Sequence, residues 1–141
     1  MSWSEAVVRE LRAVVGRDGL RTDPAELLVY DCDAYTLAKA VPWAVVFPET
    51  TSQVSQIVEI CRREKLPVFC RGAGTGLAGG ATPLGGGVIL SLTRMKRIRS
   101  VDLANRRICV EAGVLNRQLA DVLRGSGLHY APDPSSQTAC T

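Results

Sequence analysis

Glycine dominates one stretch of the chain, Arg71-Gly72-Ala73-Gly74-Thr75-Gly76-Leu77-Ala78-Gly79-Gly80. Glycine loses more backbone entropy on folding than any other residue, so such a run needs a compensating role. Glycine also lets backbone N–H groups approach a ligand closely, and consecutive amides can form a concave anion site. The alternative is a flexible surface loop, but such loops are usually richer in Ser, Asn and Asp. The segment therefore predicts a cradle for phosphate groups.

Two familiar phosphate-binding motifs do not account for this segment. The spacing Gly74-x-Gly76-x-x-Gly79 matches the dinucleotide fingerprint, but that motif has to open a helix. Here the next residues are Ala-Thr-Pro-Leu-Gly-Gly-Gly, which do not form a helix. A Walker A loop needs Gly-Lys-Ser/Thr, and no lysine lies between Lys65 and Lys96. We therefore expect a cradle between two strands, with Arg71 as the nearest fixed charge.

A strand, a helix and a second strand precede the glycines. Ala44–Phe47 and Pro67–Cys70 are short apolar runs, typical of buried strands. Between them, apolar residues recur at helical spacing, and we expect Thr51 or Ser52 to cap that helix. Such a β-α-β unit has parallel strands. A third strand is expected over Gly87–Leu92, after the glycines.

Other elements flank this unit. Ser4 is expected to cap a first helix, and Asp23-Pro24 to begin a short second one, whereas residues 29–42 show no clear period. Beyond Thr93, the pattern predicts an antiparallel strand pair, then a helix and an aperiodic tail. The strands are Arg97–Asp102 and Arg107–Glu111, the helix opens at Asn116, and the tail is His129–Thr141.

These elements define an α+β fold. We expect an N-terminal helical segment over residues 1–37. We expect a second unit over residues 38–141, in which a small parallel β-α-β subdomain precedes the start of an antiparallel-sheet subdomain. A single strand pair is rarely stable alone, and the tail has no visible support. The second unit is therefore expected to be truncated at its C-terminus.

Composition narrows the class of protein. The net charge is only +3, and the most basic stretch, residues 94–107, contains Asp102 and no aromatic residue to stack on bases, so we expect no nucleic-acid partner. Neither a secretory signal nor an apolar run long enough to span a membrane is present in the sequence. Five cysteines without a C-x-x-C pair predict reduced thiols and a cytoplasmic protein. Cys32, Cys61 and Cys109 are expected in the core.

The segment Arg71–Gly80 closely resembles the pyrophosphate loop of FAD-linked oxidases of the vanillyl-alcohol oxidase and p-cresol methylhydroxylase type. Within that family the resemblance is closest to the flavoprotein subunit of glycolate oxidases and to D-lactate dehydrogenases. It covers about residues 26–141 and includes Val110-Glu111-Ala112-Gly113-Val114 and Pro132-Asp133-Pro134-Ser135-Ser136. It implies a PCMH-type FAD-binding domain at the N-terminal end of a flavin-dependent oxidoreductase. The implied substrate is a small 2-hydroxy acid such as glycolate or D-lactate, and the implied partners are sister subunits of an oxidase complex.

The resemblance also implies which residues contact FAD. They are Arg71, Gly72, Ala73, Gly74, Thr75, Gly76, Leu77, Gly80, Asp133, Ser135, Thr138, Ala139 and Cys140. For the last five, an Asp-Pro turn and a frayed terminus are an equal alternative. Some family members attach FAD through a histidine, but His129 lies outside the loop, so we expect noncovalent FAD. Catalytic and metal-binding residues are expected in the absent half. A flavin- or nucleotide-binding module without chemistry, or a gene fragment, remain alternatives.

Overall fold

A four-stranded sheet forms the centre of the N-terminal part of the chain in the computed structural model, which describes residues 4–141. The strands, in spatial order, are β1 (Leu20–Arg21), β2 (Ala44–Val46), β4 (Val88–Ser91) and β3 (Val68–Arg71). β2 and β3 both run parallel to β4, and β1 is antiparallel to β2. The three expected strands and their parallel direction are confirmed. However, β4 lies between β2 and β3, so the strands of the β-α-β unit are not neighbours.

Side-chain caps set the helix ends. α1 (Glu5–Val15) begins after Ser4, whose Oγ accepts the Val7 N–H at 3.4 Å. α3 (Thr51–Arg63) begins after Thr50, whose Oγ1 accepts the Gln53 N–H at 3.2 Å. The expectation that Thr51 or Ser52 caps α3 is therefore wrong. The backbone of Thr50 is extended, as an N-cap requires, while Thr51 is already helical.

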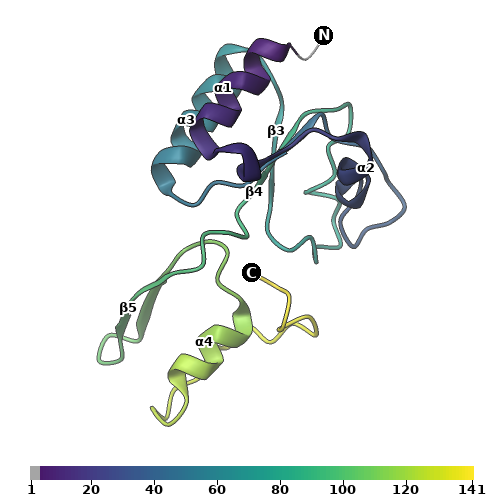
Figure 1. Cartoon of the computed structure of the whole chain (residues 1–141). Coiled ribbons are helices and arrows are strands. Elements are labelled where there is room, and N and C mark those ends of the chain that lie inside the picture. The colour runs from purple at the N-terminus through teal and green to yellow at the C-terminus, as the bar shows by residue number, and fades with distance from the viewer. Residues whose placement is uncertain (1–3) are drawn as a thin grey trace.

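The two long helices cover one face of the sheet. α1 and α3 lie side by side (Figure 1) and bury Val7, Leu11 and Ile57 against Ala44, Val46, Val88 and Leu90. Val45 and Ile89 point to the other face, as alternation along a strand requires. There they pack with Leu27 of α2 (Pro24–Leu27). Short 3-10 turns, Arg17–Gly19 and Leu28–Tyr30, follow α1 and α2.

A second lobe holds the rest of the chain (Figure 1). β5 (Ile98–Asp102) and β6 (Arg107–Val110) form the expected antiparallel hairpin, and α4 (Asn116–Leu123) follows. The tail is better supported than the sequence suggests. Its carbonyls at Gln137 and Cys140 accept the first free amides of α4, those of Arg117 and Asn116, at 3.1 and 2.9 Å. We call residues 4–92 the sheet lobe and residues 96–141 the hairpin lobe.

The cysteines differ in burial. Cys61 is fully buried, and desolvation raises its thiol pKa to about 11. Cys32 is half-buried, and a hydrogen bond with Asp31 raises its pKa. Cys109 is exposed on the hairpin, so the expectation of a core position is wrong for this residue. Separately, none of the helices in residues 4–141 has the length and apolar character needed to cross a membrane.

Candidate functional site

The glycine-rich segment forms a long loop between β3 and β4. Residues 72–87 contain neither helix nor strand, so the expectation that this segment lies between two strands and does not open a helix is confirmed. Within residues 4–141, the backbone N–H groups of residues 73–80 have no protein acceptor, and the first amide after them that has one is Ala81. A run of free, closely spaced amides is the arrangement that binds phosphate oxygens.

Glycine is needed in this loop for two different reasons. Gly74 and Gly79 have positive φ angles of 77° and 71°, which other residues rarely adopt. A Cβ at Gly74 would also lie 2.6 Å from Cζ of Arg71, so a side chain there would have to displace this guanidinium. Gly76 has an ordinary φ, and a Cβ there would meet only Oδ2 of Asp33, at 3.8 Å. At Gly76 the backbone therefore does not require glycine, although a side chain would occupy the adjoining space.

A cavity of about 370 Å³ lies against this loop. The structure brings seven of the expected contact residues together in its wall: Gly72, Ala73, Gly74, Thr75, Gly76, Gly80 and Cys140. Ala78, Ala81, Asp33 and Thr141 complete the lining. The end of the tail reaches the loop, because a Cβ on Gly72 would collide with Oγ1 of Thr141. The cavity is thus bounded by three segments that are far apart in the sequence.

The remaining expected residues lie outside this cavity. Leu77 is 76% exposed, and Ser135, Thr138 and Ala139 are exposed in the tail. Asp133 lines a neighbouring cavity of about 560 Å³ beside α4, which shares Cys140 and Thr141 with the loop cavity. The tail therefore connects two adjoining hollows, one at the loop and one at the hairpin lobe.

The Arg71 side chain anchors the start of the loop. Its Nη1 donates to the carbonyl oxygen of Cys32 at 2.7 Å, and its guanidinium lies 5.5 Å from the ring centroid of Tyr30. The same guanidinium occupies the space next to Gly74 in which a side chain would lie. Arg71 thus joins the start of the loop to residues 30–32, in addition to being the nearest fixed positive charge.

Asp33 is a wall residue that the sequence did not reveal. It is only 6% exposed. Its Oδ1 accepts the Tyr35 N–H at 2.9 Å, and its Oδ2 accepts the Ala81 N–H at 3.4 Å. The residue lies in the aperiodic stretch 29–42, where no spacing indicated a site. The only available signal was an aspartate two positions before an aromatic residue in a turn-like segment, which is a weak one.

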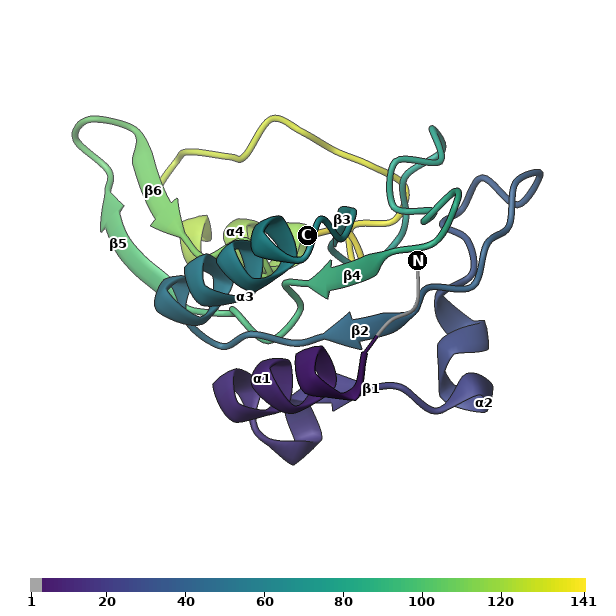
Figure 2. The same cartoon turned by 90° about the horizontal axis from the view of Figure 1, so that it is seen from above.

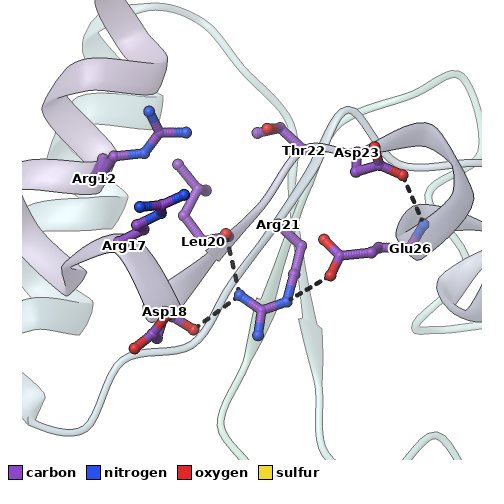
Figure 3. Close-up of a pocket in the computed structure, with 8 residues that line it drawn as sticks. All are labelled: Arg12, Arg17, Asp18, Leu20, Arg21, Thr22, Asp23 and Glu26. Carbon is purple, nitrogen blue, oxygen red and sulfur yellow. Dashed lines mark hydrogen bonds and ion pairs between the residues drawn. The ribbon is translucent and has the colours of Figure 1, made fainter.

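A larger cavity, of about 700 Å³, lies elsewhere, between α1, β1 and α2 (Figure 3). Its charged lining consists of three arginines and three acidic residues, so both signs are balanced. Arg21 is held within it by Glu26, at 3.3 Å, and by the carbonyl oxygens of Asp18 and Leu20 (Figure 3). This cavity shares no lining residue with the loop cavity. The free backbone amides of residues 73–80, and not side-chain charge, make the loop cavity the better anion site.

The lining of the loop cavity suits a pyrophosphate group. It offers free amides, a threonine hydroxyl at Thr75 and glycines that permit close approach. A family model described as an FAD binding domain matches residues 42–141. The chain belongs to this FAD-binding family. The family resemblance drawn from the glycine-rich loop is thereby confirmed.

Several curated relatives are similar in sequence to this member of the FAD-binding family. The glycolate oxidase subunit GlcD of Escherichia coli (strain K12) is 43% identical over 128 residues, covering 91% of this chain and 26% of that protein. GlcD of Bacillus subtilis (strain 168) is 35% identical, covering 96% of this chain and 29% of that protein. The D-lactate dehydrogenase of Anaerostipes hadrus is 42% identical, over 72% of this chain and 21% of that protein. This member of the FAD-binding family thus spans between a fifth and a third of each of these relatives.

Solved structures agree with the family assignment. p-Cresol methylhydroxylase with substrate bound matches with a TM-score of 0.77 and 30% identity, covering 87% of this chain and 25% of that one. Alkyldihydroxyacetonephosphate synthase matches with a TM-score of 0.84 over 99% of this chain and 30% of that one. Its identity is 21%, so it shows the fold alone. The expected PCMH-type FAD-binding fold is confirmed.

Proposed function

We propose that the loop cavity holds the pyrophosphate of FAD and that the chain is the FAD-binding part of an oxidoreductase. The observation that carries this proposal is the run of unpartnered amides over residues 73–80, which lies against a cavity in a chain of the FAD-binding family. When bound, FAD supplies the hydride acceptor, while the protein supplies binding and orientation. The chemical step therefore depends on how firmly this chain positions the nucleotide end.

The amides of Gly72–Gly76 and Gly80 provide the hydrogen-bond donors in this proposal, and the hydroxyl of Thr75 adds another. Cys140 faces them from the tail side of the cavity. In this proposal Arg71 contributes positive charge next to the loop, and it keeps its hydrogen bond to the carbonyl oxygen of Cys32. Leu77, Asp133, Ser135, Thr138 and Ala139 contact more distant parts of FAD in this proposal, because they lie outside the loop cavity.

FAD is held without a covalent bond in this proposal. The single histidine of the sequence, His129, lines a cavity of about 590 Å³ between the hairpin and α4, apart from the glycine loop. Residues 71–80 contain no histidine, so the glycine-rich loop itself offers no histidine for a covalent bond to FAD.

The substrate and partners of the whole protein are also proposals. Relatives named glycolate oxidase subunit and D-lactate dehydrogenase support oxidation of the CH–OH group of a small 2-hydroxy acid. The word subunit in two of these names supports a complex with sister subunits. A division into residues 1–37 and 38–141 and a cytoplasmic location stay predictions. If the division holds, the two parts are joined through the sheet, since β1 pairs with β2.

The FAD site is tested by replacing glycines in the full-length protein. Gly76→Val adds a side chain beside the cavity without a φ penalty, so the variant should fold like the parent and purify without FAD. Gly74→Val should also lose FAD, because its positive φ and the Arg71 guanidinium both oppose a side chain. Flavin absorbance per protein and the melting temperature of the apoprotein are the measurements.

Gly85→Val is the matched control. Gly85 lies in the same loop with a similar φ of 82°, but it does not line the cavity and a Cβ there would meet nothing within 4 Å. This variant should show the backbone strain of Gly74→Val while retaining FAD. If Gly74→Val and Gly76→Val both purify with the flavin content of the parent, FAD is bound elsewhere.

A further inference from the structure

The segment Tyr30–Tyr35 is attached to the glycine loop at both of the loop's ends. At the start, Arg71 donates to the carbonyl of Cys32 at 2.7 Å. At the far end, the Ala81 N–H donates to Oδ2 of Asp33 at 3.4 Å. The contact extends further, because a Cβ on Gly79 would lie 3.5 Å from Cδ1 of Tyr35. The two loops lie next to each other at the same end of the sheet (Figure 2). This segment precedes residues 42–141, which the family model covers.

Asp33 has an unusual environment for a wall residue of an anion site. Its carboxylate is almost fully buried and lies within 4.0 Å of no lysine or arginine nitrogen in the part of the chain that the structure describes. Burying a carboxylate is costly unless hydrogen bonds compensate, and here two backbone amides do so. The same carboxylate lines the cavity that would receive a phosphate anion. Through charge alone, Asp33 should therefore oppose the ligand.

We propose that Asp33 is a positioning residue that fixes the glycine loop in its anion-binding shape. One oxygen closes the turn at Tyr35, which makes the segment rigid, and the other holds Ala81 at the end of the amide run. Ordering the loop before the ligand arrives lowers the entropic cost of binding. That gain has to exceed the repulsion between the carboxylate and the phosphate. The inference rests on the proposed FAD site and adds to it a residue that acts through the loop.

The two effects of Asp33 predict opposite results for Asp33→Asn. The asparagine oxygen still accepts the Tyr35 N–H, so the turn is preserved. The asparagine amide would face the Ala81 N–H donor to donor, so the link to the loop is lost along with the charge. If charge repulsion dominates, the variant binds FAD more tightly than the parent. If positioning dominates, it binds more weakly.

The test uses the full-length apoprotein and FAD itself, with affinity measured by quenching of flavin fluorescence. Asp33→Asn should bind FAD about tenfold more weakly, at a temperature where circular dichroism shows parent and variant fully folded. Amides 73–81 of the apoprotein should exchange hydrogen faster in this variant. The matched control is Asp121→Asn on α4, because Asp121 forms an exposed pair with Arg124 and does not line the cavity. Its FAD affinity should stay within about twofold of the parent.

Equal or tighter FAD binding by Asp33→Asn would overturn the inference. So would an Ala81 amide that exchanges in the parent apoprotein at the rate of an open chain, a measurement that needs no variant. These failures differ from a failure of the proposed FAD site. If the FAD site is wrong, Gly74→Val and Gly76→Val keep FAD. If only the inference about Asp33 is wrong, the two glycine variants lose FAD while Asp33→Asn behaves like the parent.

Discussion

Glu111 and Arg97 are joined by a hydrogen bond of 2.9 Å from the Arg97 backbone N–H to the Glu111 carboxylate, where the chain enters and leaves the hairpin. The other carboxylate oxygen accepts from the guanidinium groups of Arg97 and Arg99, at 2.9 and 3.1 Å. Glu111 is only 4% exposed. The backbone hydrogen bond, followed by the two arginines, lowers the pKa of Glu111 below its ordinary value of 4.5. Glu111 therefore closes the base of the hairpin as a buried anion.

Replacing this anion should have a pH-dependent cost. A carboxyl whose pKa is lower in the folded state stabilises the fold above the unfolded value of 4.5, and that contribution is lost as the pH falls through the folded pKa. Glu111→Gln in the full-length protein should therefore lower the melting temperature at pH 7. The difference from the parent should shrink progressively below pH 4.5.

The control for this prediction is Glu49→Gln. Glu49 forms an exposed pair with Arg94 at 3.4 Å, and exposed pairs contribute about 0–1 kcal/mol. The melting temperature of Glu49→Gln should stay close to that of the parent both at pH 7 and below pH 4.5. A Glu111→Gln variant that melts with the parent at pH 7 would show that the buried anion does not stabilise the hairpin.

The two lobes should differ in local stability in the isolated 141-residue chain. β2 and β4 are fully buried, with α1 and α3 on one face and Leu27 of α2 on the other, whereas β5 is largely exposed and pairs only with β6. A lone two-stranded ribbon is marginally stable in water. Amides of β2 and β4 should therefore be protected from hydrogen exchange, and those of β5 and β6 should exchange quickly. Equal protection in the two lobes would contradict this expectation.

The reaction class is tested with the full-length holoprotein. Under anaerobic conditions, glycolate, D-lactate or D-2-hydroxyglutarate should bleach the flavin absorbance, and the isolated 141-residue chain should show no such reaction. A carboxylate-bearing substrate needs cationic groups to hold it and a base for its hydroxyl proton, which we expect in the remainder of the protein. Bleaching by an alcohol or a phenol alone would leave the FAD site standing and would make the substrate class wrong.

Local patterns in the sequence predicted local structure well. Ser4, the pair Asp23-Pro24 and the glycine run each act through neighbours within a few positions, so their consequences could be inferred directly. The error at Thr50 has the same origin. Three consecutive hydroxyl residues, Thr50 to Ser52, can each cap a helix, and only the backbone conformation selects one.

The contacts that shape the site could not be inferred in the same way. Asp33 reaches Ala81 across 48 positions, and Thr141 reaches Gly72 from the far end of the chain. Neither contact leaves a periodic pattern, because each depends on where two irregular segments meet. The insertion of β4 between β2 and β3 was hidden for a related reason: parallel strands in sequence order do not specify which of them are neighbours.

The Arg71 guanidinium lies next to Gly74, so the residues allowed at position 74 depend on the residue at position 71. While the arginine is present, any side chain at position 74 meets its guanidinium. A shorter residue at position 71 would remove that collision but would leave the positive φ of Gly74 unchanged. It would also release the carbonyl of Cys32. Position 74 is thus held to glycine by two independent constraints, and a single substitution at position 71 relaxes only one. In a set of related sequences, Gly74 should therefore be retained even where position 71 is not arginine.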